Sequence, residues 1–213
     1  PTSYDDIAGQ YTGLIKFSAK GMAIARKFYH DLDVPGARVE GRAFLDMHMT
    51  GFLQAMINAG IPVHPVWISG GWTECDAPED LLVDLDVSSI PVSVGSNHVA
   101  RQKPKFGTKA ETLGKRSPVL KYAWNKSKNS TRAVVLCAGQ GTRLRPLTNT
   151  VPKCMVKFQG HCIIDYILGS LRACGVDDIC LVKGYLADVL MRDGVRYAVN
   201  SDFEKTNMVA TLF

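Results

Sequence analysis

The sequence lacks an apolar run long enough to cross a membrane. Residues 133–138 form one of its longest such runs, far below the roughly 18 residues that a spanning helix needs. A basic and then apolar leader is also missing at the start, so we expect no export signal. Hydrophobic residues make up 46% and charged residues 21%, as in ordinary globular proteins, which excludes disordered and collagen-like classes. We therefore expect a folded cytoplasmic protein with no membrane partner.

The six cysteines contain no C-x-x-C pair, which is the spacing typical of zinc ribbons and redox motifs. Most of them lie in apolar runs, so the sequence predicts buried, reduced thiols rather than disulfides or metal ligands. This is the second reason to expect the cytoplasm. The cysteines are at positions 75, 137, 154, 162, 174 and 180.

Acidic residues are almost absent from residues 101–132, which carry ten Lys or Arg and a single acid, Glu111. Glycine, proline and polar residues are frequent there, so residues 88–131 are predicted to be a basic linker. A nucleic-acid-binding arm is the alternative, because basic patches attract phosphate backbones. The few aromatic side chains match no base-stacking platform, so we do not expect a nucleic-acid partner.

A glycine loop directly follows an apolar run in the second half. Residues 132–138 are typical of a buried parallel strand, and Gly139-Gln-Gly-Thr-Arg143 comes next. Glycines let the backbone approach a ligand closely and turn N–H groups inward, while Arg143 and Lys153 supply positive charge for a polyphosphate. Position 144 is Leu, which excludes the dinucleotide fingerprint, and no Gly-Lys-Ser/Thr follows, which excludes a P-loop.

The residues that follow the loop predict α/β layering. Apolar residues recur at helical spacing over 163–171, Gly175 suits a C-terminal cap, and 179–182 read as a returning strand. A further strand at 195–199 leads to Asn200, whose side chain could contact a nucleoside or cap the next turn.

The first half reads as strands and helices in mixed order. We predict strands at 10–17 and 63–67, helices at 19–32 and 43–59, and a helix start at 78–82. The methionines of the second of these helices are interpreted as core residues.

The glycine-loop region resembles the nucleotidyltransferases that activate sugar phosphates, phosphocholine and aminoalkylphosphonates. The resemblance rests on Ala138-Gly-x-Gly-Thr-Arg-Leu-x-Pro-Leu-Thr148, Pro152-Lys153, Val156 and Gly160. It implies an α/β, Rossmann-like nucleotidyltransferase fold with a mostly parallel central sheet flanked by helices. Gly184-Tyr185, Asn200 and the residues 206–212 look closer to the phosphocholine and 2-aminoethylphosphonate cytidylyltransferases.

By this resemblance the chain is an enzyme that transfers CMP from CTP to a phosphate- or phosphonate-bearing small molecule, such as phosphocholine or 2-aminoethylphosphonate. Pyrophosphate is released and Mg²⁺ is the expected cofactor. Arg143 and Lys153 are the implied catalytic residues, and the nucleotide-binding residues are Ala138, Gly139, Gly141, Thr142 and Asn200. Two alternatives stay open: a sugar-1-phosphate nucleotidyltransferase, and an inactive truncated or permuted nucleotide-binding module.

The first half is similar to the closing part of the same family. The motif Trp72-x-Glu74-x-Asp76 implies that Asp76 is a metal ligand, with Glu74 beside it less firmly assigned. The competing interpretation is that Asp76 caps a helix, because Ala77-Pro78 follows it. Tyr11, Trp67 and Trp72 could hold a cationic acceptor head by cation–π contact, although Trp67 fits core packing better.

The two halves stand in the reverse of the family's order. We predict a closing-type half at 1–87 on the acceptor and metal side, the basic linker at 88–131, and an opening-type, nucleotide-binding half at 132–213. The chain is then permuted, a fragment that crosses from one module into the next, or assembled from two pieces. No residues resemble the family's central block, which brings another metal-binding Asp. Oligomerisation or fusion with further domains stays open.

Overall fold

The computed structural model describes residues 9–68, 72–82 and 131–213, which form two compact units. The first, here called the helical unit, contains the described residues 9–66, 72–74 and 201–213. The second, the sheet unit, contains the described residues 67–68, 75–82 and 131–200. The basic linker predicted at 88–131 lies outside the described residues except for residue 131.

The helical unit is built from three helices and a short hairpin. Its elements are α1 (Ala19–Leu32), β1 (Arg38–Val39), β2 (Arg42–Ala43), a 3-10 turn at Phe44–Asp46, α2 (Met49–Asn58) and α4 (Met208–Leu212). Helix α1 has the predicted bounds, and the Ser18 hydroxyl caps it by accepting the N–H of Gly21 at 2.9 Å. Helix α2 begins six residues later than predicted, because the buried side chains of Phe44 and Met47 are supplied by a 3-10 turn and the extended residue after it.

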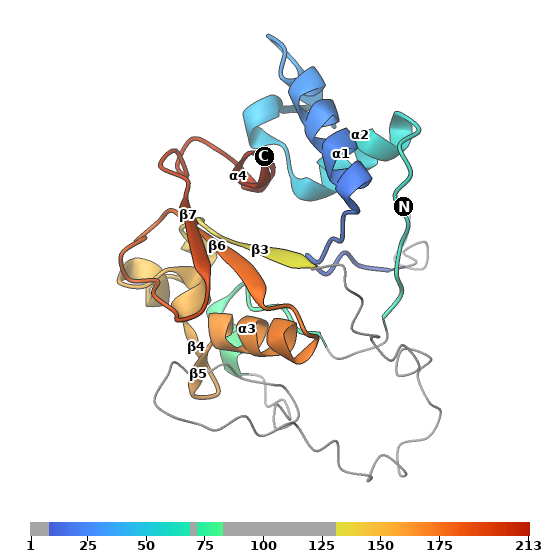
Figure 1. The fold of residues 1–213 in the computed structure, drawn as a ribbon. Coiled ribbons are helices and arrows are strands. Elements are labelled where there is room, and N and C mark those ends of the chain that lie inside the picture. The colour runs from blue at the N-terminus through green and yellow to red at the C-terminus, as the bar shows by residue number, and fades with distance from the viewer. Residues whose placement is uncertain (1–8, 69–71, 83–130) are drawn as a thin grey trace. The chain divides into compact units, whose positions relative to one another are not determined.

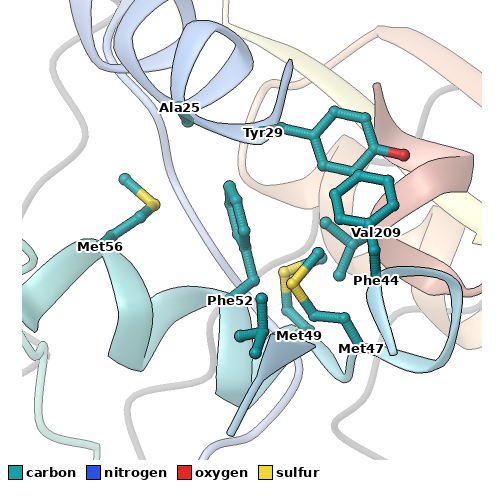
Figure 2. Close-up of a cluster of buried hydrophobic side chains, with 9 residues drawn as sticks. Ala25, Tyr29, Phe44, Met47, Met49, Phe52, Met56 and Val209 are labelled. Carbon is teal, nitrogen blue, oxygen red and sulfur yellow. The ribbon is translucent and has the colours of Figure 1, made fainter. Parts of the chain in front are cut away.

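The core of this unit is aromatic and rich in methionine (Figure 2). Tyr29 stacks on Phe213 with ring centroids 5.0 Å apart, and Phe52 meets Phe213 edge-on at 5.5 Å. The predicted core methionines Met47, Met49 and Met56 are buried here, which confirms that interpretation. The nine buried residues are Ala25, Tyr29, Val39, Phe44, Met47, Met49, Phe52, Met56 and Val209.

The strands predicted at 10–17 and 63–67 are wrong, since neither segment joins a β-ladder in the described part of the chain. Tyr11, Ile15, Phe17 and Val63 instead pack against the core of the helical unit. The alternation of apolar residues in these segments thus reflects one-sided burial, which a strand and an extended segment packed on helices both require.

The sheet unit contains a three-stranded parallel sheet in the order β3–β6–β7 (Figure 1). Its strands are β3 (Arg132–Cys137), β6 (Asp178–Lys183) and β7 (Arg196–Val199), each within two residues of the prediction. The register pairs Arg132 with Asp178 and Lys183 with Val199. This parallel sheet with its crossover helix confirms the α/β class.

Helix α3 (Ile163–Ala173) connects β3 to β6 and covers one face of the sheet. Ile164 and Leu168 of the helix pack with Ile179 and Leu181 of β6. The helix ends at Ala173, and Gly175, just beyond the capping residue Cys174, has the φ of +77° that suits its predicted role in ending the helix. The short hairpin of β4 (Lys157–Phe158) and β5 (His161–Cys162) precedes the helix. The described part of this unit also contains 3-10 turns at Pro78–Leu82, Thr142–Leu144, Leu147–Asn149 and Lys153–Met155.

Asp165, in the first turn of α3, forms the most buried ion pair in the described residues. The Arg192 guanidinium donates from Nε to Oδ1 at 2.6 Å and from Nη2 to Oδ2 at 3.1 Å. The two side chains are only 12% and 15% exposed. Asp165 also accepts the N–H of Cys162, so one carboxylate caps the helix and ties it to the segment before β7.

Substitution of Arg192 by alanine should lower the free energy of unfolding by about 3 kcal/mol, because it leaves the Asp165 charge buried without its partner. Urea denaturation followed by circular dichroism measures this change. The matched control is Arg196→Ala, whose ion pair with Asp178 is mostly exposed and should be worth less than about 1 kcal/mol. Equal effects from the two substitutions would contradict the prediction.

All six cysteines are free thiols, as predicted, but their burial is uneven. Cys137 and Cys154 are buried, whereas Cys174 is exposed because it lies in the turn that ends α3, so burial was overpredicted. Across the described ranges, none of the helices combines the length and apolarity that a bilayer crossing requires.

Candidate functional site

The glycine loop, residues 138–153, begins at the carboxyl edge of the sheet. Strand β3 ends at Cys137, β6 at Lys183 and β7 at Val199, so the residues after all three strands lie along one edge. Asn200 is among them, and its N–H donates to the Lys183 carbonyl at 2.8 Å. Ligands of open parallel sheets bind at this edge.

Hydrogen bonds join the loop to Tyr185, two residues after the end of β6. The Tyr185 N–H donates to the Ala138 carbonyl at 2.9 Å, and its hydroxyl donates to the Thr148 carbonyl at 3.0 Å. Thr148 is fully buried, and its own hydroxyl donates to the Gly141 carbonyl at 2.9 Å. Tyr185 and Thr148 thus fix both ends of the turn, a role that the sequence analysis did not assign.

The two ends of the loop are also anchored by buried thiols. Cys137 precedes the loop and Cys154 follows it, and both belong to the core of the sheet unit. A hydrogen bond with Cys154, together with burial, raises the pKa of Cys137. Its thiol is therefore protonated at neutral pH and serves packing rather than nucleophilic chemistry.

Glycine is required at one of the two predicted positions in the loop. Gly141 has φ +62°, and a Cβ there would come within 2.8 Å of Lys153 Cβ and 3.2 Å of Thr148 Cγ2. Gly139 has no atom within 4 Å of such a Cβ. The absent side chain of Gly141 therefore lets Thr142 and Arg143 begin a 3-10 turn directly against Lys153.

We expect Gly141→Ala to lower the midpoint of thermal unfolding clearly, because it adds about 1–2 kcal/mol of left-handed strain to the clash with Lys153. Gly139→Ala, two residues away, should leave the midpoint almost unchanged, since its Cβ meets open space. Differential scanning calorimetry of the two variants provides the comparison. A stable Gly141→Ala protein would contradict this account of the loop.

Three of the predicted site residues meet at the end of this loop. The Asp76 carboxylate accepts from Arg143 Nη1 at 2.8 Å through Oδ2 and from Lys153 Nζ at 2.5 Å through Oδ1. Asp76 is 23% exposed, while the Arg143 side chain is 74% exposed. The two cations are therefore spaced so that one oxyanion fits between them.

Capping of the turn after Asp76 is performed by another acid. Asp80 Oδ2 accepts the N–H of Asp76 at 2.7 Å and that of Ala77 at 2.8 Å. The carboxylate of Asp76 is left for Arg143 and Lys153, which favours the functional interpretation of this residue over the capping one. Sequence reasoning missed Asp80, although its place three residues after Ala77 matches the second position of a capping box.

The other candidate residues from the first half are not among the contacts of Asp76 described above. Glu74 accepts a hydrogen bond from Gln10 Nε2 at 3.3 Å, and Trp72 donates from Nε1 to the Thr12 carbonyl at 3.1 Å. Burial raises the pKa of Tyr11. Trp67 is 63% exposed, so its predicted core position is wrong: residues 61–68 form no strand that would bury it.

The Asp76 carboxylate is an oxygen donor of the kind that a metal at this site could use. Within the described ranges, no three His, Cys, Asp or Glu side chains are grouped to hold a metal on their own. Magnesium commonly uses one or two carboxylates together with substrate phosphates. A hard carboxylate beside two basic side chains fits that substrate-bridged mode, and it does not fit a metal site formed by the protein alone.

The family model described as Nucleotidyl transferase matches residues 132–205. These residues are therefore similar to nucleotidyltransferases. The matched residues, here called the nucleotidyltransferase segment, contain the whole glycine loop, the parallel sheet and α3. Arg143, Lys153 and Asn200 lie within it, whereas Asp76 lies outside it.

Curated relatives of this chain include three cytidylyltransferases. CTP:phosphoglutamine cytidylyltransferase of Campylobacter jejuni is 45% identical over 86 residues, covering 38% of this chain and 34% of that protein. Choline-phosphate cytidylyltransferase of Streptococcus pneumoniae is 34% identical and covers 38% of both chains. 2-Aminoethylphosphonate cytidylyltransferase of Lancefieldella rimae is 31% identical, covering 39% of this chain and 36% of that protein.

Uridylyl- and guanyltransferases for sugar phosphates match over shorter stretches, of 71 and 60 residues. The chain thus spans little more than a third of the length of the three cytidylyltransferases. Their names agree on cytidylyl transfer and differ in the compound named with it.

Proposed function

We propose that this chain acts in a cytidylyltransferase reaction, in which CMP is transferred from CTP to a phosphate- or phosphonate-bearing small molecule. An oxygen of the acceptor attacks the α-phosphorus of CTP. The bond from that phosphorus to the oxygen bridging the β-phosphate breaks, and pyrophosphate leaves. The protein contributes position and charge, which is where most of the catalysis of such transfers originates.

One observation carries the proposal: the Asp76 carboxylate between Arg143 and Lys153. A carboxylate held at 2.8 and 2.5 Å by a guanidinium and an ammonium occupies the kind of position that a phosphate oxygen would take. Because the triphosphate carries more charge than one carboxylate, we expect it to displace Asp76 from both cations. The released carboxylate is then available to a metal.

The roles of the remaining residues follow from their place at the sheet edge. Backbone N–H groups of Gly139, Gly141 and Thr142 approach the triphosphate, with Ala138 at the entry to the loop. Arg143 stabilises charge on the leaving pyrophosphate, and Lys153 lies between the α-phosphate and the attacking oxygen. Asn200, at the end of β7, contacts the nucleoside.

Mg²⁺ is the cofactor that we propose, held by Asp76 and the phosphates. When bound, it neutralises phosphate charge and assists departure of pyrophosphate. Asp76 has a second role that needs no metal: in the absence of nucleotide it keeps Arg143 and Lys153 paired, which avoids repulsion between two adjacent cations.

We also propose that residues 1–87 act on the acceptor and metal side, with 88–131 as the linker and 132–213 as the nucleotide-binding half. The contacts of Asp76 support a shared site, since they join it to residues 67 and 77 positions later in the sequence. In this proposal the two halves of the family stand in reverse order, so Asp76 precedes the glycine loop in the sequence.

Pyrophosphate release by the purified chain, with Mg²⁺ and each of CTP, UTP and GTP, tests the proposed function. The acceptors are phosphocholine, 2-aminoethylphosphonate and glucose 1-phosphate. We expect release with CTP and one of the first two acceptors. Release only with UTP or GTP and glucose 1-phosphate would assign the chain to the sugar branch, and calorimetry that shows CTP binding without turnover would favour the inactive module.

A further inference from the structure

The turn that carries Asp76 is closed by a single carboxylate. Asp80 Oδ2 accepts two backbone N–H groups, from Asp76 at 2.7 Å and from Ala77 at 2.8 Å. The Asp80 N–H returns a hydrogen bond to the Ala77 carbonyl at 3.1 Å. The backbone of residues 76–80 is therefore locked by a reciprocal set of bonds, one of which is made by Asp76 itself.

We propose that Asp80 is a positioning residue, which fixes the Asp76 backbone so that the Asp76 carboxylate lies between Arg143 and Lys153. The inference rests on the function proposed for Asp76, and it extends the site to a residue that touches neither nucleotide nor metal. Asp76 lies two residues before the 3-10 turn Pro78–Leu82, which contains Asp80. A carboxylate that accepts the N–H of Asp76 restricts rotation of the backbone at that residue.

Asp80 keeps its charge throughout the neutral range. Hydrogen bonds from the N–H groups of Ala77 and Asp76 hold the pKa of Asp80 below its ordinary value of 3.8. Because the pKa is lower in the folded protein, the stabilisation is complete above the unfolded value and is lost as the pH falls through the folded one.

Chemical labelling of Lys153 tests this without any need for turnover. An amine held in a hydrogen bond with a carboxylate is less available to acetic anhydride, so the acetylation rate of Lys153, measured by mass spectrometry, reports its pairing with Asp76. We expect Asp76→Ala and Asp80→Ala to accelerate labelling to the same extent. Asp80→Asn should stay at the wild-type rate, because its amide oxygen accepts the same two N–H groups.

A control variant and a control lysine complete the labelling experiment. Glu79→Ala removes the neighbouring exposed acid of the same turn and should leave the rate unchanged. The exposed Lys157 reports general unfolding, since it would react faster in any variant that loses its fold. A wild-type rate in Asp80→Ala, or an Asp80→Asn rate as high as that of Asp76→Ala, would overturn the proposal, as would an unchanged rate in Asp76→Ala.

The Mg²⁺ dependence of pyrophosphate release by the Asp80 variants is the second measurement. If the proposed function holds, Asp80→Ala should raise the Mg²⁺ concentration needed for half-maximal pyrophosphate release, and Asp80→Asn should restore it. If the wild-type chain releases no pyrophosphate with any acceptor, the proposed function fails while the labelling experiment still decides the role of Asp80.

Discussion

Replacing Arg143 with alanine is expected to lower CTP-dependent pyrophosphate release by at least about a hundredfold while leaving the fold intact. Removal of one preorganised donor from a developing phosphate charge typically costs two to three orders of magnitude in rate. The Arg143 side chain is mostly exposed, so little packing is lost with it. The measurements are kcat and KM for CTP, with circular dichroism as the check on folding.

The matched control is Arg145→Ala, which removes the same charge two residues further along the loop. The Arg145 guanidinium donates to the Gln140 side chain at 3.3 Å, so it is engaged away from Asp76. Its loss should change kcat by no more than a few-fold. Similar losses in both variants would mean that net charge, and not the position of Arg143, governs the reaction.

Asp76→Ala should give opposite effects on nucleotide binding and on turnover. Without magnesium, CTP should bind at least as tightly as to the wild type, because no carboxylate then competes for Arg143 and Lys153. With magnesium, pyrophosphate release should fall by about a hundredfold or more, since the only protein oxygen proposed to hold the metal is gone. Calorimetry in EDTA and steady-state kinetics in Mg²⁺ measure the two quantities.

Glu79→Ala is the control here as well, because it deletes an exposed acid three residues from Asp76. Both quantities should match the wild type. If Asp76→Ala weakened CTP binding in EDTA, the carboxylate would be needed to organise the two cations rather than to compete with the triphosphate.

The sheet unit was predictable because its signals are local. The apolar run at 132–138, the helical spacing at 163–171 and the glycine at 175 fixed β3, α3 and its end to within a few residues. The first half gave a different result. Apolar residues alternate at 10–17 and 63–67, and this pattern predicted strands. Alternation indicates only that one side of a segment is buried, whereas a β-strand also needs a hydrogen-bonded neighbouring strand, which neither segment has in the described part of the chain.

In the candidate site, too, the sequence indicated the residues but not their contacts. Arg143, Lys153 and Asp76 could be named from their motifs, yet nothing in the sequence states that residue 76 reaches residues 143 and 153. Asp80 was hidden for a related reason: two acids in one short turn can each act as the cap. In the structure the Asp76 carboxylate pairs with Arg143 and Lys153, and the Asp80 carboxylate accepts the backbone N–H groups of the turn. The sequence does not show which of the two acids has the cations beside it.

The most direct test of the central claim is a CTP titration followed by ¹H–¹⁵N NMR of the backbone amides in the loop. The amides of Gly139, Gly141 and Thr142 should shift progressively and saturate together, and CDP should produce the same pattern with weaker affinity. If millimolar CTP leaves these three amides unmoved, the glycine loop does not bind the triphosphate and the proposed transferase reaction is wrong.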